Sequence, residues 1–185
     1  MASSWYPWLK LTVFALLACN AAVFSLAGTF TEALDAGAWL TLLALFELET
    51  GSGDRIRGRR EAAIVHGARL IAAAAVVGAA LGYVFDNGWL DAVNSALWIA
   101  VVVLLELEVR YPGTVKRHRS AFAASAATLY TGLAALVLVW ACRSEWFDAY
   151  DALLWLIAFV TIELNVLHLA PGEDLRTGAG TAKST

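Results

Sequence analysis

One pattern of polar and aromatic residues occurs three times in the sequence, and it limits the folds that the chain can adopt. Each copy begins with an aromatic residue, which is followed by an acid two residues later, Asp or Asn five later, Trp nine later and Glu-Leu seventeen later. The glutamates of the three copies, Glu47, Glu106 and Glu163, lie 59 and then 57 residues apart. A fixed period of this kind is typical of a fold built from structural repeats.

The composition indicates that these repeats lie in a membrane. Hydrophobic residues make up 60% of the 185 residues and charged residues 16%, and the mean hydropathy is +0.66. A soluble domain of this length could not bury so much apolar surface, so we expect the lipid bilayer to cover its outer face. The weak net charge of −3 and the few basic residues exclude a nucleic-acid-binding face.

Six apolar segments, each close to the length that crosses a bilayer, divide the chain into three hairpins. The predicted fold class is all-α: one polytopic membrane domain, residues 1–185, with six transmembrane helices in a pseudo-three-fold bundle. The hairpins are expected at 8–50, 62–109 and 120–169, and a polar tail at 171–185 is expected to be disordered. Gly78 and Gly82 have the small-x3-small spacing that lets helices approach closely, and we expect them to pack within the chain.

The basic residues predict the orientation of the chain in the membrane. Eight of them lie in two segments that join one predicted hairpin to the next, at 55–60 and 110–119, whereas Arg143 is alone on the opposite side. The positive-inside rule then places both termini in the cytoplasm, and a bacterial inner membrane is the natural setting.

On a helix, the repeated acids and Trp share one stripe about 120° wide. A charge that faces lipid is costly, so we expect the three stripes to face one another or water. The predicted interior has an acidic outer part, a layer of Trp, and the three glutamates at the inner end. The outer residues are Glu32, Asp35, Asp91, Asn94, Asp148 and Asp151. The Trp layer consists of Trp39, Trp98 and Trp155, for which core packing is favoured over ligand stacking.

Two of the inner glutamates have a basic residue at a matching position in their own hairpin. Lys10 and Arg69 each lie 37 residues before Glu47 and Glu106, respectively. Folding each hairpin about its turn brings both pairs to a similar depth, so structural ion pairs are expected. Arg110 is a further partner for Glu106 at the i,i+4 spacing. The alternative is that these glutamates serve ion transport.

The third copy lacks such a basic residue, because Ala126 stands at the matching position. Glu163 is therefore the strongest candidate for binding or relaying a cation or a proton, with Asn165 as its neighbour. The further candidates for ion binding or relay are Glu47, Glu106, Asp35, Asn94 and Asp151.

Cofactor sites and catalytic motifs have little support in the sequence. His66 and His168 lie near the inner end and are weak candidates for a metal or haem site, but no metal-ligand or haem-attachment motif contains them. Nucleophile motifs and phosphate-binding loops are absent from the sequence as well. We therefore predict no cofactor and no enzymatic activity.

Two functions remain open at this point. The first is a cation or proton conduit that uses the repeated carboxylate stripe, and the repetition of that stripe favours it slightly. The second is a non-catalytic accessory or scaffold subunit of a larger membrane complex, which would dock through small-residue and Trp faces. The expected partners are the lipid bilayer, an inorganic cation or proton, and either further copies of the chain or other membrane subunits.

Overall fold

The computed structural model describes residues 6–51 and 58–169, and the side chains within 8–48, 58, 60–108 and 110–161. Every element in this part of the chain is a helix, so the predicted all-helical class is confirmed. The helices are α1 (Tyr6–Ala27), α2 (Phe30–Gly51), α3 (Arg59–Phe85), α4 (Trp89–Arg110), α5 (Pro112–Arg117), α6 (Arg119–Cys142) and α7 (Trp146–Leu169). The predicted tail, residues 171–185, lies outside the described ranges.

The six long helices coincide with the six apolar segments of the sequence, but α5 occupies a segment expected to be a loop. Pro112 is the first residue of α5. Proline suits this position because the N–H that it lacks would have no partner in the first helical turn, and because its φ is already close to the helical value.

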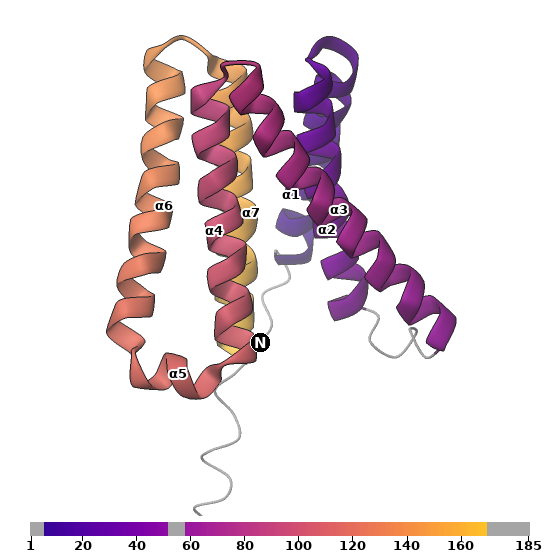
Figure 1. Ribbon diagram of the computed structural model, residues 1–185, viewed down its shortest axis with the longest axis vertical. Coiled ribbons are helices and arrows are strands. Elements are labelled where there is room, and N and C mark those ends of the chain that lie inside the picture. Colours follow the sequence, from indigo (N-terminus) through magenta and orange to yellow (C-terminus); the bar gives the residue numbers. More distant parts are fainter. Residues whose placement is uncertain (1–5, 52–57, 170–185) are drawn as a thin grey trace, which may run out of the picture.

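The long helices contact one another in a closed ring with the order α1, α2, α3, α4, α6, α7, in which α7 returns to α1. The turns α1–α2, α3–α4 and α6–α7 lie at one end of the molecule, and α5 lies at the other (Figure 1). We call these the turn end and the α5 end. The helices that carry the repeated pattern, α2, α4 and α7, therefore alternate around the ring with α1, α3 and α6.

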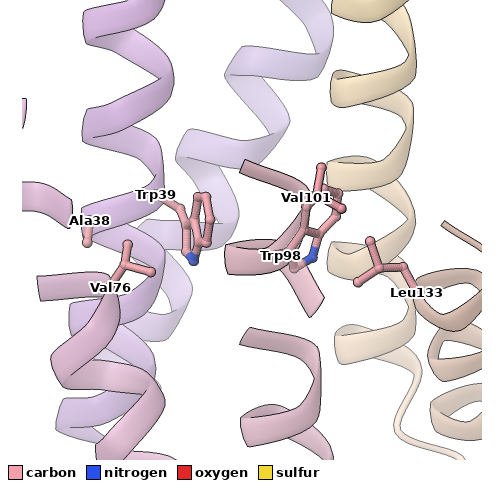
Figure 2. Close-up of a cluster of buried hydrophobic side chains, with 6 residues drawn as sticks. All are labelled: Ala38, Trp39, Val76, Trp98, Val101 and Leu133. Carbon is pink, nitrogen blue, oxygen red and sulfur yellow. The ribbon is translucent and has the colours of Figure 1, made fainter. Parts of the chain in front are cut away.

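A central hydrophobic cluster packs inside the ring between helices that are distant in sequence. Its buried members come from α2, α3, α4 and α6 and are Ala38, Trp39, Val76, Trp98, Val101 and Leu133 (Figure 2). Partly buried residues of α7, including Trp155 and Phe159, pack against it. All three repeat helices thus contribute to one core.

The outward faces of the long helices are apolar. Leu26, Ile71 and Leu138 are more than half exposed, and many other large aliphatic side chains are exposed as well. Among the described residues, four helices, α1, α3, α4 and α6, are long and apolar enough to cross a membrane. Helix α2 carries the acidic residues Glu32 and Asp35 near its beginning and Glu47 near its end.

The contact between α3 and α2 depends on Gly82. A Cβ at this position would lie 2.8 Å from Cγ2 and 3.0 Å from Oγ1 of Thr31. Thr31 is buried, and its hydroxyl donates to Asp86 Oδ2 at 2.8 Å, so it cannot easily move aside. We therefore expect Gly82→Ala to lower the free energy of unfolding by about 1–2 kcal/mol through overpacking, measured by denaturation of the purified protein in detergent.

Gly78→Ala is the matched control for this prediction. A Cβ at Gly78 would meet nothing within 4 Å. Alanine is the better helix former, so this variant should be as stable as the wild type or slightly more stable. Equal losses in the two variants would show that the contact with Thr31 does not cause the effect.

Candidate functional site

Four aromatic side chains from the three repeat helices contact one another inside the ring. The ring centroids of Trp39 lie 6.4 Å from Trp98 and 6.3 Å from Trp155. Phe159 completes the set, with its centroid 4.6 Å from Trp98 and 6.3 Å from Trp155. Each of the four side chains thus contacts two of the others, and we call this closed set the aromatic layer. The packing agrees with core filling and brings together all three repeated Trp residues.

The spacing between the repeated Asp and Trp has a structural reason that the sequence reasoning missed. In α2 Trp39 follows Asp35 by four residues, and in α7 Trp155 follows Asp151 by four residues, so each indole lies one helical turn from its carboxylate. Residues four apart face the same side of a helix, and the indole N–H can only donate. Each of these Asp residues therefore lies directly on the turn-end side of the aromatic layer.

Four carboxylates lie on the turn-end side of the aromatic layer, and we call Asp35, Asp91, Asp148 and Asp151 the acidic cluster. Asp35 and Asp151 precede their Trp by about one helical turn, and Asp91 and Asp148 precede theirs by about two. Asp35 interacts electrostatically with Asp91 and Asp151, and Asp148 interacts with both Asp91 and Asp151. The cluster thus has members on α2, α4 and α7. A set of like charges with low-dielectric surroundings creates a negative potential that attracts cations.

Basic residues are scarce near the acidic cluster. Within the described ranges, Arg143 is the one Lys or Arg at the turn end. Its guanidinium is engaged by Glu145, with Nε 3.0 Å from Oε1. The carboxylates of the cluster are therefore held mainly by neutral partners.

Two neutral partners come from helices outside the repeated pattern. Asn20 of α1 donates to Asp151 Oδ1 at 2.8 Å, and Tyr83 of α3 donates to Asp35 Oδ2 at 3.4 Å. The sequence reasoning missed both residues. Asn20 could have been found as a polar residue in an otherwise apolar segment, but Tyr83 carries no such signal.

Glu32, another predicted outer residue, has a local structural role. Its carboxylate accepts from the backbone N–H of Thr29 at 2.6 Å, and its own N–H donates to Thr29 Oγ1 at 3.2 Å. These reciprocal bonds form a capping box, which satisfies backbone donors at the beginning of α2.

The glutamates near the α5 end form ion pairs. The Lys10 ammonium contacts Glu47 Oε1 between α1 and α2, and Arg110 Nε contacts Glu106 Oε1 within α4. The pairing of Arg69 with Glu106 stays a prediction. Figure 1 shows that α3 leans away from α4 toward the α5 end.

Four other predicted residues lie apart from the acidic cluster or outside the described side chains. The side chains of Glu163, Asn165 and His168 lie outside the described set. His66 is exposed. Among the described residues, no group of three or more His, Cys, Asp or Glu side chains could hold a metal ion.

The fold and the site together define an all-helical protein with membrane-like helices and a polar site between its repeat helices. The chain matches no protein-family model, no curated protein and no solved structure.

Proposed function

We propose that the protein is a conduit for small cations or protons. In this proposal it crosses a bacterial inner membrane six times, as hairpins 8–50, 62–109 and 120–169 around an approximate three-fold axis. The alternation of the repeat helices around the ring supports this arrangement. The concentration of Lys and Arg at the α5 end supports cytoplasmic termini, because basic loops remain on the cytoplasmic side.

The proposal rests on the acidic cluster, which lies on the turn-end side of the aromatic layer. Bringing four carboxylates together contributes little to folding, because like charges repel and each loses part of its hydration. The same arrangement lowers the cost for a cation that enters the interior of the bundle. Asp35 and Asp151 lie at the point where such an ion would meet the aromatic layer.

The aromatic layer gives this conduit a closed state. Trp39 and Trp98 are 8% and 5% exposed, so water has little access between them. Passage then requires the aromatic side chains to move apart. The ion pairs of Glu47 and Glu106 stabilise the helices on the other side of the layer, and a relay role for Glu163 stays a prediction.

Flux into proteoliposomes tests the proposal. The purified full-length chain should conduct protons or alkali cations above the level of empty vesicles. Asp35→Asn and Asp151→Asn should each reduce this flux by about tenfold or more, which corresponds to about 1.4 kcal/mol of lost cation stabilisation. Glu61→Gln is the matched control, because Glu61 is an exposed carboxylate at the other end of the bundle and should not affect flux.

The accessory-subunit hypothesis predicts a different set of results. The wild-type protein would then show no flux above empty vesicles and would copurify with another membrane protein at a fixed stoichiometry. That combination would overturn the conduit proposal.

A further inference from the structure

Three buried polar atoms close to the aromatic layer have no hydrogen-bond partner in the described structure. They are Asp35 Oδ1 on α2 and Asn94 Oδ1 and Ser95 Oγ on α4. Buried polar atoms in folded proteins are nearly always hydrogen-bonded, so a group of three without partners requires an explanation. A ligand that oxygen atoms can coordinate would satisfy all three atoms.

Ser95 provides the strongest sign of such a ligand. Hydroxyls within helices usually donate to the carbonyl four residues earlier. Ser25, Thr41, Thr128 and Thr161 all do so here, at 2.6–2.8 Å. Ser95 is 1% exposed, yet its hydroxyl makes no hydrogen bond to any described residue. The Ser95 hydroxyl is therefore buried, and it does not donate to the carbonyl four residues earlier in its own helix.

Helix geometry places Ser95 on the inner face of α4. It follows Asp91 by four residues and precedes Trp98 by three, so it lies within about 60° of each of them around the helix axis. Asp91 belongs to the acidic cluster and Trp98 to the aromatic layer. The Ser95 hydroxyl is consequently on the same stripe of α4, between the two.

The other two atoms come from matching positions of the repeat. Asp35 and Asn94 each precede a Trp of the aromatic layer by four residues, about 6 Å along a helix. The rings of these two residues, Trp39 and Trp98, lie 6.4 Å apart. Asp35 and Asn94 therefore lie at a similar depth on α2 and α4, on the turn-end side of the layer. Asp35 Oδ2 accepts from Tyr83, which leaves Oδ1 for a ligand.

We propose that Asp35 Oδ1, Asn94 Oδ1 and Ser95 Oγ bind one small alkali cation. This inference rests on the proposed conduit function and gives it a cargo and a binding site. Carboxylate, amide and hydroxyl oxygens are hard ligands, which suit alkali and alkaline-earth ions and not soft transition metals. The cation also compensates the single negative charge of Asp35, which no basic residue of the described part contacts.

The composition of the site favours a monovalent over a divalent ion. Calcium takes about six to eight oxygen ligands, usually with several carboxylates among them. Only one of the three unpartnered oxygens belongs to a carboxylate. Sodium, which carries one charge, is therefore the appropriate probe.

Direct binding of radioactive sodium to the purified full-length protein in detergent tests the site. The wild type should bind sodium saturably, and a lithium excess should compete. Ser95→Ala should raise the Kd about tenfold, the equivalent of one lost ligand of about 1.4 kcal/mol, and Asn94→Leu should raise it further. Asn94→Asp keeps an oxygen at the site and should retain binding, which separates ligand loss from misfolding.

Ser25→Ala is the matched control, because Ser25 donates to the Ala21 carbonyl and is exposed. Its sodium affinity should equal that of the wild type. An absence of saturable sodium binding, or a Kd unchanged in both Ser95→Ala and Asn94→Leu, overturns the cation site and indicates that ordered water satisfies the three atoms.

The site and the conduit can fail separately in these experiments. Proton flux into proteoliposomes without sodium binding would preserve the conduit and remove the cation site. Saturable sodium binding without any flux would preserve the site and overturn the conduit.

Discussion

Replacing Trp39 with Ala is expected to lower the free energy of unfolding by about 3–5 kcal/mol. This indole contacts those of both Trp98 and Trp155 and is 8% exposed, so its removal leaves a void in the aromatic layer. Chemical or thermal denaturation of the purified protein in detergent micelles measures the change.

Trp8→Ala is the control for this substitution. Trp8 is 71% exposed, so the same change of side chain there should have a small effect on stability. If Trp39→Ala folds, it should also leak ions faster than the wild type in proteoliposomes, because the closed aromatic layer has lost one member. Equal destabilisation by the two substitutions would contradict a structural role for the layer.

Replacing Asn20 with Leu is expected to lower the free energy of unfolding by about 1.5–3 kcal/mol, the range for a lost hydrogen bond to a charged group. Asn20 is 5% exposed, and its amide donates to Asp151 Oδ1 at 2.8 Å. The bond joins α1 to α7, the pair of helices that closes the ring. Leu is similar in volume but cannot donate, so it leaves the carboxylate without its partner from α1.

A double-mutant cycle identifies the cause of this loss. Asn20→Leu combined with Asp151→Leu removes both the donor and the acceptor, so the double variant should lose less stability than the sum of the two single variants. Additive losses would show that the two side chains do not act as a pair. Gel filtration should show that all three variants remain monodisperse before their stabilities are compared.

Much of the fold was predictable because its signals are local. Apolar segments separated by short polar turns indicate helices regardless of where those helices pack, and six long helices occur in those segments. The repeated pattern also predicted that Trp39, Trp98 and Trp155 lie at one level, since equal positions in equal helices have equal depth. The short helix α5 was not predicted, because its six residues are too few to show a periodic apolar pattern.

The candidate site was predictable only for the residues within the repeats. Asp35 and Asp151 follow from the pattern, but their partners Tyr83 and Asn20 come from α3 and α1. Which residue of a neighbouring helix meets a given carboxylate depends on the rotation and tilt of that helix. Neither quantity can be read from hydropathy.

The sequence by itself determined the six long helices, their approximate lengths and the stripe of acids and Trp on three of them, because periodicity within one helix depends only on residues three and four apart. Only the tertiary structure decided that α3 leans away from α4 and that Ser95 is buried without a hydrogen-bond partner among the described residues. These features depend on how whole helices pack against one another, and that packing is set by many side chains at once.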